Sequence, residues 1–259
     1  MGDWQHELFV EKADLFLRVM DARWPRAEKL VEGMLGVLSG YGIHSGELLD
    51  LCCGNGRICV HMAKRGFRAT GIDISDRFLE DAGEKAREHG VSHLTRFVQG
   101  DVREFKRVLG HISQPFDVVT SVWTSVGYSI REGDVSIFSQ ARELARKGAV
   151  LVVADTAHSA RWPVVRTSYS DLGDMVMLEE AKQDQFRFTV QTTWSFYSKD
   201  GQNLKFVDKV GFEIHVYGLS EFSSLLSEAG WEPVVAYGDL STLQPLTPLT
   251  GLNLVSVAK

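Results

Sequence analysis

Residues 48–57 read LLDLCCGNGR, and this stretch decides the fold. Its apolar first half predicts a buried strand, and Gly54 and Gly56 interrupt the chain before a segment of helical character. A strand, a glycine bend and a helix in this order are typical of the first unit of a parallel α/β sheet. Such sheets bind ligands beyond the carboxyl ends of their strands, which is where these two glycines lie.

The alternation of strand and helix continues along the chain. Helices are expected at 57–64, from Ser75 to Gly90, at 134–146 and at 220–229. The strands that separate or follow them are expected at 47–52, 67–72, 95–99, 116–122, 149–154, 231–237 and 252–258. The pattern predicts an α/β fold with a doubly wound, mostly parallel sheet and right-handed crossovers.

Two segments depart from this rhythm. Residues 1–46 are expected to form a helical N-terminal lid over the ligand site, with a helix break at Trp24 and a second helix opening at Pro25. Residues 158–217 are expected to form an antiparallel β insertion on the substrate side, because apolar residues alternate on both sides of the turn signal at 200–201. Residues 47–157 would then form the core, and residues 218–259 would complete its sheet.

Composition excludes several classes of protein. The formal net charge is -6, which argues against duplex nucleic acid as a partner because phosphate contacts need clustered Lys and Arg. The three cysteines (Cys52, Cys53 and Cys59) lack partners at zinc-ligand spacing, so no metal site is expected, and they fit a reducing, cytoplasmic compartment. No apolar run approaches the roughly 18 residues of a membrane span, and the N-terminus is too charged for a secretory signal.

Carboxylates follow the next two strands. Asp73 ends the second strand in GIDIS, where its oxygens could accept hydrogen bonds from both hydroxyls of a ribose. Asp101 ends the third strand in QGDV, where it could accept from an adenine amino group while the Val102 amide reaches a ring nitrogen. Each has a plain structural alternative, a helix cap for Asp73 and an Asx turn for Asp101. Together with the glycine bend they favour an adenosine-containing ligand.

The ordered motifs resemble those of the class I S-adenosylmethionine-dependent methyltransferases. LLDLCCGNGR corresponds to the glycine motif, GIDIS to the acidic motif, QGDVREF to the adenine motif and FDVVTSVWTSVGY to the fourth motif. The N-terminal helices, the insertion and the ending GLSEFSSLLSEAGW are similar to a branch that includes sugar N,N-dimethyltransferases and related small-molecule methyltransferases. The resemblance implies a Rossmann-like sheet of seven strands and S-adenosyl-L-methionine as the cofactor.

The resemblance also implies roles for matching residues. Asp50 would hold the first turn and help to place the cofactor amino group, and the backbone of strand four would contact the methionine ammonium. The cofactor-binding residues implied in this way are Asp50, Cys52, Gly54, Gly56, Asp73, Ile74, Asp101, Val102, Ser121 and Val122. At the expected helix break, Arg23 would pair with the cofactor carboxylate and Trp24 would shield the sulfonium, although a connector with one packed Trp explains Trp24 equally well.

The sequence indicates catalytic side chains less clearly than cofactor-binding ones, because methyl transfer from a sulfonium mainly requires a correctly positioned nucleophile and exclusion of water. Tyr128 and His158 are the catalytic candidates, with core packing and a solvated loop position as the respective alternatives. Trp123 and Thr124 would stand beside the methyl group, and Arg161 and Arg166 could bind an anionic substrate.

The predicted function is methyl transfer to nitrogen or oxygen of a small molecule. A nicotinamide dehydrogenase is disfavoured because Cys59 stands where a Gly-x-G-x-x-G motif needs its third glycine. Methylation of RNA or protein, and S-adenosylmethionine binding without catalysis, remain alternatives. The insertion hairpin could also pair two copies of the chain into a homodimer.

Overall fold

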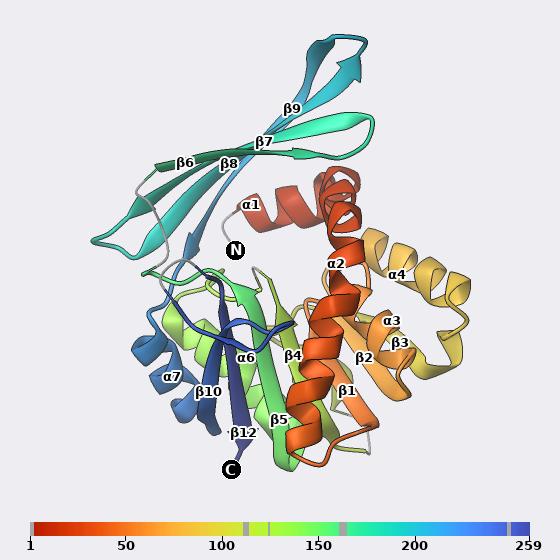
Figure 1. The fold of residues 1–259 in the computed structure, drawn as a ribbon, viewed down its shortest axis with the longest axis vertical. Helices are drawn as coiled ribbons and strands as arrows, with labels where there is room; N and C mark the ends of the chain where they lie inside the picture. The colour runs from red at the N-terminus through yellow and green to blue at the C-terminus, as the bar shows by residue number, and fades with distance from the viewer. Residues whose placement is uncertain (1–2, 111–113, 124, 161–164, 248–249) are drawn as a thin grey trace.

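The computed structural model describes residues 3–110, 114–123, 125–160, 165–247 and 250–259. Two β-sheets lie one above the other, with the N-terminal helices between them (Figure 1). The lower and larger sheet carries helices on both faces, and the upper sheet ends in a hairpin that projects from the molecule (Figure 1).

The larger sheet confirms the predicted fold class. Its strand order is β11-β10-β12-β5-β4-β1-β2-β3, and β3, β2, β1, β4 and β5 run parallel while β12 is antiparallel to both of its neighbours. The eighth strand is the two-residue β11. The strands are β1 (Gly46–Leu51), β2 (Phe67–Asp73), β3 (Thr95–Gln99), β4 (Phe116–Val122), β5 (Ala145–Thr156), β10 (Trp231–Asp239), β11 (Gln244–Pro245) and β12 (Leu252–Ala258).

Alternation along the central strands divides the core into two layers. Val118 of β4 packs on one side and Val119 on the other, because successive side chains of a strand point to opposite faces. The layer with Val119 is covered by α5 (Phe105–Leu109), α6 (Arg131–Leu144) and α7 (Leu219–Glu228). The layer with Val118 is covered by α2 (Ala13–Gly40) and α3 (Arg57–Ala63).

Helix α4 (Asp76–Glu88) begins where the sequence predicts. The Ser75 hydroxyl accepts a hydrogen bond from the Phe78 backbone N–H at 3.4 Å and caps the helix. Phe78, Ala82 and Ala86 recur every four residues and are buried, so one face of the helix packs on the protein. A short 3-10 turn, η2 (Ser92–Leu94), leads from this helix into β3.

The predicted helix break at Pro25 is wrong. After α1 (Asp3–His6) and a π-helical turn η1 (Glu7–Glu11), α2 runs without interruption through Pro25. Proline fixes φ near its helical value and removes one backbone donor, so its cost in a helix is one lost hydrogen bond and a crowded carbonyl. Pro25 and Asp21, whose carbonyl loses that partner, are both exposed, so the carbonyl is not left buried without a partner. Buried residues before and after Pro25 hold the two halves of α2 against the core.

The antiparallel insertion is a four-stranded sheet in the order β6-β7-β8-β9. Its strands are β6 (Val165–Asp171), β7 (Met175–Asp184), β8 (Thr189–Asp200) and β9 (Asn203–His215). Asp200 pairs with Asn203, which confirms the predicted turn at 200–201. The sequence did not single out β6 and β7 because β6 buries no residue and therefore shows no apolar alternation.

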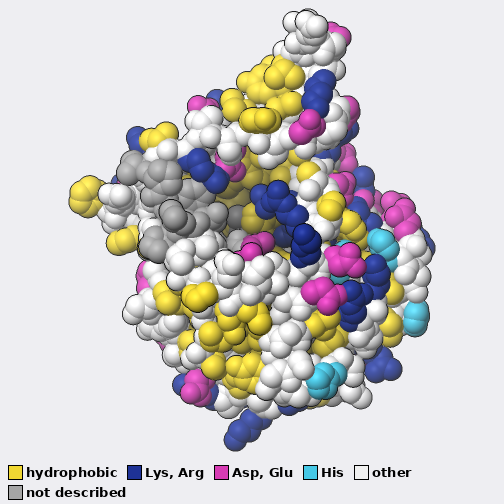
Figure 2. All heavy atoms as spheres, viewed as in Figure 1, with side chains coloured by type: hydrophobic (Ala, Val, Ile, Leu, Met, Phe, Trp, Pro, Cys, Tyr) yellow, Lys and Arg dark blue, Asp and Glu magenta, His cyan; other side chains and the backbone are white. Residues whose placement is uncertain are grey.

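The underside of this sheet packs on the N-terminal helices. Trp194, Phe196 and Val210 from the insertion share one buried cluster with Leu8 and Phe16 from the N-terminal segment. Figure 2 shows a recess below the insertion in which hydrophobic side chains are visible, with Lys and Arg side chains along one edge. The insertion is therefore anchored to the larger sheet through the N-terminal helices as well as through its own chain connections.

A close approach at Gly71 of β2 gives a first prediction. A Cβ atom there would lie 2.6 Å from Cys53 Sγ, whereas a Cβ atom on Gly83 in α4 would meet nothing within 4 Å. We expect Gly71→Ala to lower the free energy of unfolding by about 1–3 kcal/mol through overpacking. Gly83→Ala should raise it by about 0.5–1 kcal/mol because alanine favours a helix. Urea unfolding of both variants checks this, and an unchanged midpoint for Gly71→Ala would contradict it.

Candidate functional site

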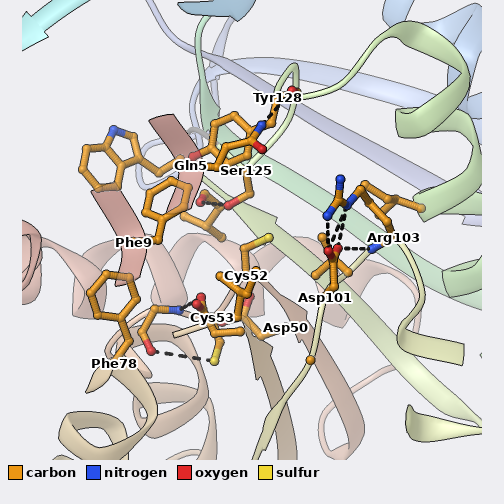
Figure 3. Close-up of a pocket in the computed structure, with 18 of the residues that line it drawn as sticks. Gln5, Phe9, Asp50, Cys52, Cys53, Phe78, Asp101, Arg103, Ser125 and Tyr128 are labelled. Carbon is orange, nitrogen blue, oxygen red and sulfur yellow. Dashed lines mark hydrogen bonds and ion pairs between the residues drawn. The ribbon is translucent and has the colours of Figure 1, made fainter. Parts of the chain in front are cut away.

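A pocket of about 990 Å³, including its open mouth, lies at the carboxyl ends of β1 to β4. Its floor comes from the larger sheet and the turns that follow its strands, and its roof comes from the N-terminal segment (Figure 3). The lining residues are Gln5, Phe9, Phe16, Met20, Asp50, Cys52, Cys53, Gly54, Arg57, Ile58, Asp73, Ile74, Phe78, Gly100, Asp101, Val102, Arg103, Val122, Trp123, Ser125, Tyr128, Ser129, Asp134 and Ile137.

The glycine bend forms one wall of this pocket. Cys52 and Gly54 both have φ of 54° and Gly56 has φ of 73°, so the chain turns through left-handed conformations that glycine adopts at low cost. Gly54 lines the pocket and exposes its backbone there. Gly56 does not line it. A Cβ atom on Gly56 would lie 2.8 Å from the side chain of Ala82 in α4. This glycine, which precedes α3, therefore lets the start of α3 pack closely against α4.

Asp73 is buried at the end of β2 and anchors the bend. Its Oδ2 accepts a hydrogen bond from the Gly54 N–H at 2.9 Å, and its Oδ1 accepts from the Ser75 N–H at 3.0 Å. Burial raises the pKa of Asp73 to about 6, against the opposing effect of these backbone donors. Each oxygen keeps a second lone pair for a ligand hydroxyl.

Asp101 lies at the end of β3, on the same edge of the sheet (Figure 3). Its carboxylate pairs with the guanidinium of Arg103 and accepts the Arg103 backbone N–H at 2.9 Å. These hydrogen bonds lower the pKa of Asp101, so it is ionised and available as an acceptor over a wide pH range. Asp73 and Asp101 therefore present two carboxylates from neighbouring strands to one pocket, as the sequence predicts.

Asp50, at the same end of β1, also faces the pocket. Its Oδ1 accepts from the Thr120 hydroxyl at 2.7 Å, and the Cys59 thiol lies 3.8 Å from its Oδ2. Burial raises the pKa of Asp50 to about 7, so part of the population is protonated at neutral pH.

Aromatic side chains form the roof of the pocket. The ring of Phe9 lies 5.6 Å from that of Tyr128, and the ring of Phe16 lies 5.5 Å from that of Trp123. Gln5 Nε2 donates a hydrogen bond to the Tyr128 carbonyl at 2.9 Å, which fastens α1 to the loop after β4. These individual N-terminal lining residues could not be picked out from the sequence, because apolar helical residues have no signal that separates a pocket wall from a core.

The loop after β4 carries Tyr128 and is fixed by buried polar contacts. Oδ2 of Asp134 accepts from the Gly127 N–H at 3.1 Å and from the Tyr217 hydroxyl at 2.6 Å. The Gly127 carbonyl in turn accepts from the His215 N–H at 2.8 Å. The end of the insertion is thus tied to the loop that places Tyr128 in the pocket.

With this geometry in view, a comparison with protein-family models matches residues 48–148 to the family described as a methyltransferase domain. The matched segment begins at the first residue of LLDLCCGNGR and contains Asp73 and Asp101. This part of the chain is similar to a methyltransferase domain.

Relatives and solved structures agree with this domain. One relative is the YqeM protein of Bacillus subtilis, which is provisionally named a methyltransferase. The two sequences are 26% identical in an alignment that covers 77% of this chain and 79% of YqeM. An S-adenosylmethionine-dependent methyltransferase from Clostridium acetobutylicum superposes with a TM-score of 0.77 at 17% identity, over 95% of this chain and 98% of its own. An amino pentose methyltransferase from Micromonospora echinaspora, solved with S-adenosylmethionine bound, gives a TM-score of 0.72 at 15% identity, over 95% and 97%. At these identities the structural likenesses establish the fold alone.

Most of the expected cofactor residues line the pocket described above. These are Asp50, Cys52, Gly54, Asp73, Ile74, Asp101, Val102 and Val122, together with the catalytic candidate Tyr128. Ser121 is buried within β4, paired with Leu51 and Val153 on the neighbouring strands, and does not line the pocket. Thr124 and Arg161 lie outside the described residues.

Two expected site residues lie elsewhere. The Trp24 ring stacks on His89 at 5.7 Å and contacts His61 at 5.4 Å, so it does not cover the pocket as predicted. The continuous helix α2 carries it to the side of α3 and α4. His158 is buried, and its Nε2 lies 2.9 Å from the Thr250 carbonyl. It is neither a pocket residue nor the solvated histidine offered as the alternative, because the chain after β5 turns it toward the C-terminal segment.

The raised pKa of Asp73 predicts a pH dependence for ligand binding. Protonation below about pH 6 removes an acceptor, so the affinity of this pocket for S-adenosylhomocysteine should fall roughly tenfold between pH 7 and pH 5. Calorimetry at the two pH values measures this. The loss should be smaller in Asp73→Asn, in which Asp50 still titrates in this pH range, and a loss equal to that of the wild type would contradict the part given to Asp73.

Protonation of Asp73 does not unfold the protein, so unfolding through this residue would not explain a loss of affinity at low pH. The folded pKa of Asp73 lies above that of an exposed carboxyl group, so the folded state takes up a proton more readily than the unfolded chain. Between about pH 6 and pH 4 this group therefore makes folding more favourable as the pH falls.

Within the described residues, no helix combines the length and the hydropathy needed to cross a bilayer.

Proposed function

We propose that the protein is an S-adenosylmethionine-dependent methyltransferase that transfers a methyl group to nitrogen or oxygen of a small molecule. The observation that carries this proposal is the pair of carboxylates, Asp73 and Asp101, at the ends of adjacent strands beside the glycine bend. The match of residues 48–148 to the methyltransferase domain supports it independently.

The pocket fits S-adenosylmethionine as the cofactor. Asp73 would accept the ribose hydroxyls, and Asp101 with the Val102 amide would bind the adenine edge. Ile74 and Val102 supply apolar contacts for the faces of the adenine ring. Gly54 exposes its backbone to the methionine part of the cofactor, and a Cβ atom there would lie 2.6 Å from the Met20 sulfur, so glycine also lets Met20 pack against the bend.

Charged groups around the bend suit the amino-acid tail of the cofactor. Arg57 is the first residue of α3 and lines the pocket beside Gly54, so it would take the carboxylate. Asp50 and the Val122 backbone carbonyl would face the ammonium group. The sequence-based prediction gave the carboxylate to Arg23, but Arg57 is the arginine that lines this part of the pocket.

When bound, the cofactor supplies a methyl group that its sulfonium charge already activates. The protein then has to hold the acceptor in line and keep water out, and well-aimed positioning alone can contribute about 7–11 kcal/mol to lowering the barrier. The aromatic roof of Phe9, Phe16 and Tyr128 would exclude water. We propose that Tyr128, on the loop fixed by Asp134, contacts the acceptor.

Coverage of the pocket favours a small molecule over RNA or a protein. The N-terminal helices lie across the carboxyl ends of the strands, beneath the insertion sheet (Figure 1). The fold shared with an amino pentose methyltransferase makes amines the first acceptors to test.

Binding and turnover test the proposal separately. Calorimetry should show S-adenosylhomocysteine binding, and no heat at millimolar ligand would reject the proposal. Release of labelled methyl should then be measured over a panel of amines and hydroxy compounds. Binding without transfer to any compound would favour the non-catalytic alternative.

A further inference from the structure

Two arginine side chains share one tryptophan beside the pocket. The guanidinium carbon of Arg23, on α2, lies 4.2 Å from the ring centre of Trp123, and that of Arg57 lies 5.5 Å from it. In the part of the chain that the structure describes, neither guanidinium forms an ion pair with a carboxylate. Two like charges are thus held on one aromatic ring without a direct counter-charge.

This arrangement is electrostatically costly. Burial, and after it the nearby charge of Arg57, lowers the pKa of Arg23 to about 10. Asp155 at the end of β5 and Glu179 on β7 oppose this effect without contacting Arg23 directly. Glu179 is already engaged, because it pairs with Arg166 and accepts a hydrogen bond from Trp194 Nε1 at 2.9 Å. An anionic ligand would relieve the repulsion between the two arginines.

The two arginines differ in their relation to the pocket: Arg57 lines it, whereas Arg23 does not and lies against the ring of Trp123, which does. Arg57 lines the wall beside Gly54, and Asp50 on the pocket floor is among the charges that act on it. Glu179 of the insertion is among the charges that act on Arg23 and is not among those that act on Arg57. The cofactor carries a single carboxylate, which one guanidinium satisfies. A second anion is needed for Arg23.

Backbone strain marks the same place. Trp123 has φ of 72° and Asp155 has φ of 55°, although neither residue is glycine. Trp123 directly follows β4, Asp155 lies near the end of the adjacent β5, and the Trp123 N–H donates to the Ala154 carbonyl at 2.8 Å. Strained residues of this kind persist at ligand sites, where the surrounding structure holds them in a productive orientation.

We propose that Arg23 binds an anionic group of the methyl acceptor, a carboxylate or a phosphate, against the face of Trp123. This inference rests on the proposed function, since it takes the cofactor to occupy Arg57. It makes Arg23 a specificity-determining residue and assigns the acceptors to the class of acidic small molecules that carry an amine or a hydroxyl group.

Calorimetry on the complex with S-adenosylhomocysteine tests the proposal, because that ligand fills the cofactor site first. Benzoate and phenyl phosphate serve as anionic probes, and benzyl alcohol serves as their neutral counterpart. At least one anion should bind at least about tenfold more tightly than benzyl alcohol, and which of them binds distinguishes carboxylate from phosphate recognition.

Three variants complete the test. Arg23→Gln should abolish the preference for the anion while leaving the affinity for S-adenosylhomocysteine within threefold, which also shows that the variant is folded. Arg23→Lys should retain part of the preference. Arg26→Gln removes the same charge from an exposed position on the same helix and should retain all of it.

Two results would overturn the proposal. Equal binding of anionic and neutral probes by the wild type would show that no anion site exists. A loss of tenfold or more in S-adenosylhomocysteine affinity in Arg23→Gln would show that Arg23 holds the cofactor instead. Failure of the wild type to bind S-adenosylhomocysteine at all would be a failure of the proposed function and is seen in the first titration.

Discussion

Asp73→Ala should weaken S-adenosylhomocysteine binding by at least a hundredfold, about 3 kcal/mol, in calorimetric titrations. The variant removes the carboxylate that would accept both ribose hydroxyls, and hydrogen bonds to charged groups are each worth about 1.5–3 kcal/mol. It also leaves the Gly54 and Ser75 N–H groups without their acceptor, so the glycine bend loses its anchor. This is the largest effect on binding that we expect from a single substitution.

Two further variants separate the ligand effect from the structural one. Asp73→Asn retains one acceptor oxygen and should bind more tightly than Asp73→Ala but more weakly than the wild type. Asp76→Ala removes an exposed carboxylate three residues along and should bind like the wild type. An Asp73→Ala protein that bound within threefold of the wild type would contradict the assigned role of this residue.

Gly127→Ala should cause the largest loss of stability among the single-methyl substitutions considered. A Cβ atom at this position would lie 2.1 Å from the His215 carbonyl oxygen, and Gly127 has φ of 87°. We expect the free energy of unfolding to fall by about 2–5 kcal/mol, from left-handed strain together with overpacking. Because the loop carries Tyr128, methyl transfer should fall with it even where the protein remains folded.

Gly173→Ala is the matched control. Gly173 has φ of 86° but nothing lies within 4 Å of its Cβ position, so this variant measures the cost of the backbone conformation alone. Chemical denaturation should show that Gly127→Ala loses at least about 1 kcal/mol more than Gly173→Ala. Equal losses would mean that the contact between Gly127 and His215 does not constrain the loop.

The parallel sheet was predictable because its signals are local. The strands β1, β2 and β3 are each followed within three residues by a glycine or end at a carboxylate, and helices such as α4 carry their own cap and apolar face. The ends of those strands also contain most of the cofactor residues. Once the strands are parallel, Asp73 and Asp101 must lie on one edge of the sheet, so sequence order alone brings them together.

The failures concern residues whose positions depend on long-range packing. Pro25 carries a strong local signal for a helix boundary, but the buried residues on both sides keep α2 continuous. Because α2 is continuous, Trp24 lies away from the pocket, against His89, and Arg23 lies beside Trp123. His158 lies against Thr250, a partner 92 residues away that no local pattern indicates. Phe9 and Phe16 became pocket residues only through the stacking of the insertion above them.

The crystal structure of the protein with S-adenosylhomocysteine tests the central claim most directly. The account predicts the ribose hydroxyls on Asp73, the adenine edge at Asp101 and Val102, and the amino-acid tail along the backbone of Gly54. Ligand bound at another surface, or a ribose that leaves Asp73 in contact only with Gly54 and Ser75, would contradict it.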